Sequence, residues 1–331
     1  MIRTLYRPPG GSPRTGLKRD ELGPALAAEG GLLWIDLAGE PPAACEPLLR
    51  ETFGFHPLAV EDALEEAHAP KLNEWPGYLY AVFKCAAFAG PAVAEEPVEL
   101  DVFLGRNFLV TYHESAIPAL DRVWNAWESD RRRDVAGADR LLYVLVDELA
   151  EEYFAALDLL NEALEDLQDQ VMGTPTVEIL KRILSVKRAV SHLRRAASPQ
   201  REVLNRLARD EHPEISEDAR VYFRDAYDRF ASLHDQYENL QDLVTSSLDV
   251  YLSVVNNRMS EVNNRLNEVM ERLTIVATWF LPASFFVGLF GMNPWREVLA
   301  DWHWWGLLLF ATAVFALPGV FFWWMRRRGW M

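Results

Sequence analysis

The sequence has 331 residues, of which 50% are hydrophobic, and a formal net charge of −16 at pH 7. An acidic surface attracts cations and repels nucleic acid, so we exclude a nucleic-acid-binding protein. Cys45 and Cys85 have no metal-ligand spacing and are predicted to be reduced core thiols. The sequence contains no phosphate-binding glycine motif, so nothing supports coupling to ATP. We therefore expect neither an enzyme nor a resident cofactor.

Residues 1–138 are predicted to form a cytoplasmic α/β domain. Its predicted strands are rich in β-branched and aromatic residues and bounded by Gly and Pro. They are segments 31–39, 77–88 and 97–115. Segment 56–68 has a helical pattern that Pro70 ends. The N-terminal residues lack the apolar stretch of a secretory signal.

Residues 139–212 are predicted to form an antiparallel pair of cytoplasmic helices with a turn at 173–175. Residues 141–172 contain nine acidic and no basic side chains, whereas residues 181–209 contain nine basic and one acidic. Opposite charges favour two helices that fold back on each other. Two interpretations remain open: these faces satisfy each other, or they take part directly in ion binding.

A long stalk helix is predicted over residues 213–272, continuing into the membrane. After Glu214 neither Pro nor Gly occurs before Pro282, so the helix could extend over about 70 residues, or about 100 Å. A single helix of that length needs partners along its side. The sequence therefore indicates association with other helices.

Two uncharged segments near the C-terminus predict two membrane spans. Residues 273–295 and 302–325 lack charged side chains, and each exceeds the ~20 apolar residues that cross a bilayer. We expect four parts in this region: a first span at 273–291, an external loop at 292–303, a second span at 304–325 and a basic tail at 326–331. Eight of the twelve Trp residues lie at or after Trp279, as in interfacial belts. The alternative is a buried hairpin of a soluble domain.

Basic residues predict the orientation of the two spans. Arg326, Arg327 and Arg328 follow the second span, and three further arginines precede the first. By the positive-inside rule, both termini are cytoplasmic and the loop is external. The predicted location is the inner or plasma membrane, with the chain crossing it twice.

A polar stripe at heptad spacing approaches the first span. It consists of Asn256, Ser260, Asn263, Asn267, Met270 and Thr274. A dry coiled-coil seam tolerates about one buried Asn, so such a column favours helices that surround water. The same face continues through Ala277, Leu281, Ser284 and Gly288. One helix cannot enclose a pore, so this interpretation needs several copies around a rotation axis. Alternatively, small residues only allow close helix packing.

The segment that ends in Gly291-Met292-Asn293 resembles the CorA-type divalent metal-ion transporters. The likeness rests on Gly-Met-Asn at the outer end of a first span, with a second span and a short basic tail behind it. Segments 56–84 and 103–115 also resemble the soluble domain of that family. The resemblance implies a cyclic homopentamer with an α+β cytoplasmic domain, a stalk that lines the pore and an outer ring of second spans.

The resemblance also implies roles for individual residues. Gly291, Met292 and Asn293 form the selectivity filter, and Met270 and Leu273 form a hydrophobic constriction. The remaining positions that match the pore face of the family are Asn267, Ala277, Leu281, Ser284 and Gly288. A neutral ring of oxygens suits Mg²⁺, which keeps several of its waters when bound.

Cytoplasmic cations that bridge acidic groups between subunits close the pore in this family. A row of aspartates at seven-residue spacing on the stalk is a candidate for this role: Asp228, Asp235, Asp242 and Asp249, with Asp225 beside the first. The alternative is a solvated charged face, and the usual distance of the family from Gly-Met-Asn leads to Ser232 instead.

The predicted function is passive, potential-driven Mg²⁺ uptake across a lipid bilayer. A second hypothesis is a Zn²⁺ transporter of the same fold, or one for Co²⁺ or Ni²⁺, with or without proton coupling. The pore face contains no histidine, which favours Mg²⁺ over metals that prefer imidazole. A third hypothesis is a non-conducting metal sensor or scaffold in the membrane.

Overall fold

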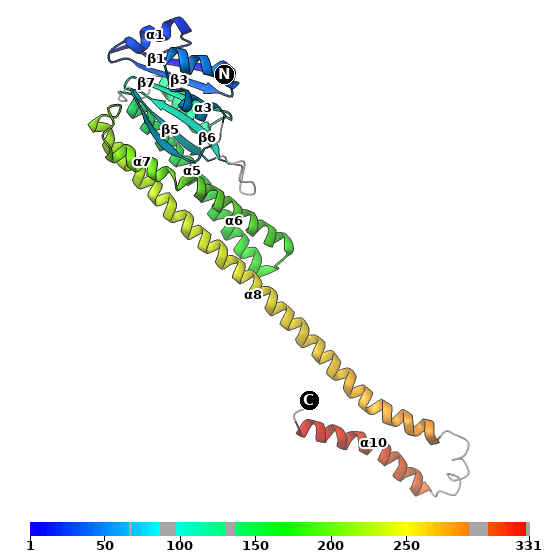
Figure 1. Ribbon diagram of the computed structural model, residues 1–331. Helices are drawn as coiled ribbons and strands as arrows, with labels where there is room; N and C mark the ends of the chain where they lie inside the picture. Colours follow the sequence, from blue (N-terminus) through cyan, green and yellow to red (C-terminus); the bar gives the residue numbers. More distant parts are fainter. Residues whose placement is uncertain (66–67, 87–96, 130–136, 291–303, 329–331) are drawn as a thin grey trace. The chain divides into compact units, whose positions relative to one another are not determined.

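The computed structural model describes residues 1–65, 68–86, 97–129, 137–290 and 304–328 (Figure 1). The chain divides into two units, Met1–Tyr251 and Leu252–Met331. The first unit contains a β-sheet and several helices. The second contains the end of helix α8 (Glu217–Phe290) and helix α10 (Trp304–Arg327).

A mixed seven-stranded sheet organises the first unit, in the order β2-β1-β3-β7-β6-β5-β4. Its strands are β1 (Ile2–Arg7), β2 (Arg14–Thr15), β3 (Leu32–Ala38), β4 (Lys71–Trp75), β5 (Tyr78–Cys85), β6 (Val98–Leu104) and β7 (Phe108–His113). Strands β3 and β7 are parallel, and the other neighbouring pairs are antiparallel. The three predicted strand segments correspond to β3, β5 and the β6–β7 pair, whereas β1, β2 and β4 were not predicted.

One face of the sheet packs against short helices. These are α1 (Arg19–Ala27), α2 (Pro42–Pro47), the π-helix η1 (Leu48–Thr52) and α3 (Pro57–Glu65). Leu33, Ile35 and Leu37 of β3 point into this core because alternate residues of a strand face the same side. Trp34 and Asp36 point to the other face and are also fully buried. Burial on both faces explains the continuous apolar run of β3.

A tight turn at Pro76-Gly77 joins β4 to β5 and fixes their register. Trp75 pairs with Tyr78 across this turn. Gly77 has a φ of +86°, a conformation that side chains with a Cβ rarely adopt. The turn therefore fixes the position of β4, including Glu74, at the edge of the sheet.

Longer helices cover the second face of the sheet. They are α4 (Pro118–Glu128), α5 (Ala138–Gly173), α6 (Val177–Ala197) and α7 (Gln200–Arg209). The buried Tyr153 hydroxyl on α5 donates a hydrogen bond to the Lys84 carbonyl of β5 at 2.9 Å. Acidic side chains of α5 form ion pairs with Arg122 of α4 and Arg229 of α8. Part of the acidic face of α5 is therefore neutralised by helices other than α6.

Helix α8 (Glu217–Phe290) has 74 residues, which confirms the long C-terminal helix. Its first half lies alongside α5 and α6 in Figure 1 and presents a buried seam with three- and four-residue spacing. The buried seam consists of Ala219, Phe223, Ala226, Phe230, Leu233, Tyr237, Leu240, Val244, Ser247 and Tyr251. The Tyr237 hydroxyl donates to the Tyr153 carbonyl at 3.0 Å, and Gln168 donates to the Ser247 hydroxyl at 2.7 Å. These contacts fix the first half of α8 against α5.

Cys45 and Cys85 are free, buried thiols, as predicted. Burial raises the pKa of Cys45 to about 11, with a smaller contribution from Glu40. Burial also raises the pKa of Cys85 well above its ordinary value. Both thiols are therefore protonated at neutral pH.

Candidate ion pathway and charged networks

The middle of α8 is exposed, without a buried face against the other described parts of the chain. Every residue from Asn256 to Thr274 is exposed, including the whole polar stripe predicted from the sequence. Further along α8, Leu281, Ser284 and Gly288 are also exposed, and Ala277 is half-buried. The predicted pore residues from Asn256 to Met270 therefore lie on a face that is open to solvent in the single chain, whereas Thr274, Ala277 and Leu281 line a pocket that also includes Phe321.

The hydroxyl groups of the polar stripe are already bonded to their own helix. Ser260 Oγ donates to the Asn256 carbonyl at 3.0 Å, and Thr274 Oγ1 donates to the Met270 carbonyl at 2.7 Å. With its proton used in this way, each hydroxyl oxygen still has lone pairs available as acceptors. Such oxygens can accept hydrogen bonds from the waters around a cation.

An apolar stripe lies beside the polar stripe on α8, and our sequence analysis missed it. Its members are 55–62% exposed and have alternating three- and four-residue spacing: Met259, Val262, Leu266, Val269, Leu273 and Val276. The same heptad spacing, offset by one residue from the polar stripe, was the sequence signal that could have revealed it. A continuous exposed apolar surface of this kind marks an interaction site.

The aspartates proposed for regulation lie on the exposed side of α8, away from the buried seam. Asp228, Asp235, Asp242 and Asp249 are all exposed, as is Ser232. Asp225 is exposed too, and it accepts a hydrogen bond of 3.3 Å from the Tyr143 hydroxyl. Exposure agrees with both interpretations of this row, so a regulatory role stays a prediction.

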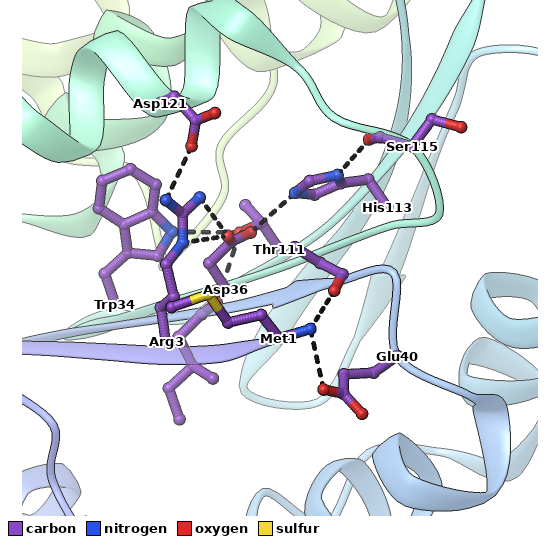
Figure 2. Close-up of polar contacts among 11 residues, drawn as sticks. Met1, Arg3, Trp34, Asp36, Glu40, Thr111, His113, Ser115 and Asp121 are labelled. Carbon is purple, nitrogen blue, oxygen red and sulfur yellow. Dashed lines mark hydrogen bonds and ion pairs between the residues drawn. The ribbon is translucent and has the colours of Figure 1, made fainter.

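A buried polar network joins β1, β3, β7 and α4, centred on Asp36 (Figure 2). Arg3 Nη2 lies 2.6 Å from Asp36 Oδ2, and Arg3 Nη1 lies 2.7 Å from Asp121 Oδ1. Thr111 Oγ1 donates to Asp36 Oδ1 at 2.7 Å. His113 completes the network, with Nε2 at 3.2 Å from Asp36 Oδ1 and Nδ1 at 2.6 Å from the Ser115 carbonyl.

Within this network, Asp36 and His113 each stabilise the charged form of the other. Burial alone raises the pKa of Asp36, but the contacts of its carboxylate with His113, Thr111 and Arg3 lower it below its ordinary value. Burial alone lowers the pKa of His113, but hydrogen bonding and charge from Asp36 raise it. The Ser115 carbonyl can only accept, so His113 Nδ1 carries a proton. Our sequence analysis missed this network, although a charged residue inside the apolar run of β3 was a signal for it.

A second buried carboxyl group lies on the opposite face of the sheet. Asp101 of β6 is 2% exposed, and Tyr80 donates a hydrogen bond of 2.6 Å to it. Burial raises the pKa of Asp101 well above its ordinary value. Nearby, Lys84 Nζ lies 2.6 Å from Glu99 Oε2. These contacts give polar partners to Asp101 and Glu99 on the sheet face that also carries the apolar core.

The comparison with protein families decides the identity of the chain. Residues 29–327 match the family described as CorA-like Mg²⁺ transporter protein. The chain belongs to the CorA family. Members of the family are transporters and membrane proteins, so this CorA-family chain is a divalent-cation transporter.

Individual relatives agree with this assignment. The chain is 31% identical over 293 residues to the cobalt/magnesium transport protein CorA of Thermotoga maritima, covering 87% of this chain and 79% of the relative. It is 25% identical over 302 residues to the zinc transport protein ZntB of Cronobacter sakazakii, covering 90% of this chain and 88% of the relative. The relatives thus differ in the ion that their names give.

A solved structure shares the fold. The complete structure of the CorA magnesium transporter from Methanocaldococcus jannaschii aligns with a TM-score of 0.74 and 23% identity, covering 99% of this CorA-family chain and 98% of that chain. This match confirms the predicted α+β domain followed by a long helix.

The predicted filter lies outside the described residues of this CorA-family chain. Gly291, Met292 and Asn293 directly follow the end of α8 at Phe290. Within the part of the chain that the structure describes, α8 is the one helix found long and apolar enough to cross a membrane. Helix α10 (Trp304–Arg327) has 24 residues and contains the predicted second span.

Proposed function

We propose that five copies of this chain form a ring whose central pore conducts Mg²⁺ into the cytoplasm. The observation that carries the proposal is the fully exposed surface of α8 between Asn256 and Thr274. A helix with an exposed apolar stripe that no other described segment covers needs other copies to cover it.

The two stripes of α8 give each side of the helix a role in such a ring. Before the predicted first span, the apolar stripe from Met259 to Val269, which includes Val262 and Leu266, packs against a neighbouring stalk. The polar stripe, which includes Asn263 and Asn267, then faces the axis. In a ring with cyclic symmetry, every stalk has a neighbour on both sides. A head-to-tail contact between two copies achieves this only if repeating it closes the ring. The axis is therefore lined by amide and hydroxyl oxygens.

The filter of this proposal is the ring of Gly291, Met292 and Asn293 at the outer mouth. Asn293 amide oxygens and Gly291 carbonyls accept hydrogen bonds from a hydrated ion, so Mg²⁺ enters without losing its tightly held waters. No carboxylate holds the ion, so it also leaves. Met270 and Leu273 form the constriction, which closes by excluding water.

Two membrane spans, at 273–291 and 304–325, complete the proposed subunit, with both termini in the cytoplasm. The C-terminal end of α10 supports this orientation. The Arg327 and Arg328 guanidinium groups lie 5.3 and 4.9 Å from the ring centres of Trp323 and Trp324. Paired Trp and Arg side chains are typical of the cytoplasmic boundary of a bilayer.

The membrane potential alone is sufficient to drive uptake. It supplies ~2.3 kcal/mol per elementary charge per 100 mV, so about 4.6 kcal/mol for a divalent cation. That free energy corresponds to a concentration ratio of more than about a thousandfold. Passive conduction therefore needs no other source of energy.

Flux into proteoliposomes tests the proposal. The purified chain is reconstituted with a Mg²⁺-sensitive dye inside, and a potassium gradient with an ionophore sets the potential. We expect potential-dependent Mg²⁺ entry that Asn293→Ala abolishes while the ring stays assembled. Asn263→Leu on the polar stripe should reduce flux strongly, whereas Arg265→Leu, at an exposed position on the side of the helix opposite the stripe, is the control.

The same vesicles distinguish the other hypotheses. Entry of Zn²⁺, Co²⁺ or Ni²⁺ without entry of Mg²⁺ would identify a transition-metal transporter, and dependence on a proton gradient would identify coupling. Absence of flux for all these ions from assembled protein would leave a sensor or scaffold and reject the channel.

A further inference from the structure

His212 is a buried histidine whose ring nitrogens lack good partners. It lies between α7 and α8, and its side chain is 1% exposed. Its Nδ1 atom lies 3.9 Å from Glu74 Oε1, too far for a hydrogen bond. Its Nε2 atom is buried with no hydrogen-bond partner among the described residues. A buried imidazole with so few partners costs free energy, and Nδ1, the ring nitrogen that faces Glu74, is the atom that could bind a cation there.

Two carboxylates face the same point. Glu74 comes from β4 at the edge of the sheet, and Asp210 follows the last residue of α7. One ligand atom from each of Glu74, Asp210 and His212 lies within 4.8 Å of the other two. Nitrogen and oxygen ligands bind Zn²⁺ at about 2.0–2.2 Å, so donors on one ion are separated by at most about 4 Å. A small rotation of the two carboxylate side chains would bring all three donors to that separation.

Arg206 now holds both carboxylates in place. Its Nη2 atom lies 2.8 Å from Glu74 Oε1, and its Nε atom lies 3.5 Å from Asp210 Oδ2. Its Nη1 atom donates to the Leu72 carbonyl at 2.7 Å. The guanidinium therefore keeps the carboxylates beside His212 and competes with any cation. If a cation displaced it from Glu74, Arg206 would keep its bond to Leu72.

The site is accessible on one side. The side chains of Glu74 and Asp210 are 55% and 49% exposed, whereas His212 forms the buried wall. An ion can therefore enter from water and keep one or more waters as further ligands. Three protein ligands with an open position are usual for zinc sites that are not closed structural centres.

We propose that Glu74, Asp210 and His212 bind a transition-metal ion of the Zn²⁺ class, which includes Co²⁺ and Ni²⁺. Imidazole suits these ions, whereas Mg²⁺ prefers an octahedral shell of oxygens. The bound ion links β4 to the loop before α8. The site is separate from the predicted pore residues and does not depend on which ion the pore conducts.

Metal binding to the full chain in detergent tests this site. The protein is stripped with a chelator and then titrated with Co²⁺, whose visible absorption reports imidazole and carboxylate coordination, and with Zn²⁺ in competition. We expect His212→Ala to bind one ion fewer per chain, or to bind that ion at least about tenfold more weakly. Millimolar Mg²⁺ should not displace it. His192→Ala changes a partly exposed histidine on α6 and serves as the control.

Two further variants distinguish loss of the metal site from misfolding caused by His212→Ala. Glu74→Gln alters an exposed side chain that can still accept a hydrogen bond from Arg206, and it should lose the same ion. Arg206→Gln removes the competing charge and should tighten Zn²⁺ binding. Equal Co²⁺ and Zn²⁺ binding by the wild type, His212→Ala and Glu74→Gln would overturn the proposal, and so would weaker binding by Arg206→Gln.

Discussion

The Nε2 atom of His113 lies 3.2 Å from Oδ1 of Asp36, and both side chains are buried beneath α4 and α5. The two groups shift each other's pKa in opposite directions, upward for His113 and downward for Asp36. Each pKa shift also contributes to the free energy of unfolding, because the folded state favours the charged form of each group.

The stability of the first unit should therefore depend on pH in two ranges. The contribution of His113 is complete below its ordinary pKa of 6.5 and is lost as the pH rises through its higher folded pKa. The contribution of Asp36 is complete above its ordinary pKa of 3.8 and is lost as the pH falls through its lower folded pKa. Thermal unfolding of the full chain between pH 2 and pH 9 measures both slopes. His113→Gln should flatten the alkaline slope, whereas His192→Gln should leave it unchanged; equal slopes in all three proteins would contradict the assignment.

Removing Arg3 should destabilise the domain much more than removing a surface arginine. Arg3→Met takes a partner from the fully buried Asp36 carboxylate, and we expect a loss of about 2–4 kcal/mol in the free energy of unfolding. Arg19→Met breaks an exposed ion pair of 2.8 Å with Glu51, which should cost at most about 1 kcal/mol. Denaturant unfolding of both variants gives the comparison, and similar losses would show that burial of Asp36 is unimportant.

The apolar stripe should control assembly. Leu266→Lys places a charge where neighbouring stalks are proposed to pack, and we expect monomers or dimers instead of a ring in detergent. Asn264→Lys introduces the same charge at an exposed position on the opposite side of the helix and should leave the ring intact. Mass measurement of the detergent complexes distinguishes these results. A ring that survives Leu266→Lys would show that the stripe faces lipid or water.

Asp228 and Asp235 should mediate closure by internal Mg²⁺ if they face neighbouring stalks. Like charges gathered near an axis repel, and a bound divalent cation holds them together. The double variant with Asn at both positions should weaken inhibition of flux by internal Mg²⁺. Changing two exposed acids of α5 in the same way, Asp158→Asn and Glu165→Gln, controls for the loss of charge. Identical inhibition curves for all proteins would show that these aspartates form only a solvated charged face.

The parts of the fold that depend on local pattern were predictable. Helix α8 follows from a long stretch without Pro or Gly, and β3, β5 and β7 follow from apolar runs between turn residues. Strand β1 was missed because its short, charged sequence becomes a strand only by pairing with β3. The Asp36 network was missed for a similar reason. Arg3 meets Asp121 across 118 residues of sequence, and no local pattern encodes such a contact.

The predicted ion pathway could likewise be inferred from local pattern, whereas the proposed metal site could not. The spacing of Asn256, Ser260 and Asn263 indicated a polar face, and the structure places that face on an exposed helix. The proposed site at His212 could not be found in this way, because its candidate ligands come from β4 and from a loop more than 130 residues later. Only the pairing of β4 with β5 and the packing of α7 bring these residues together.

Helix α8 keeps three- and four-residue apolar spacing from Ala219 to Val276, but its partners change along the way. Up to Tyr251 the buried seam is covered by the chain itself, and from Met259 onward the apolar stripe is exposed. In the proposed ring, a newly made chain would therefore complete its packing only when it assembles with other copies of itself. Until then it would expose an apolar surface of the kind that chaperones and proteases recognise. Unassembled copies should therefore be degraded faster in the cell than assembled ones.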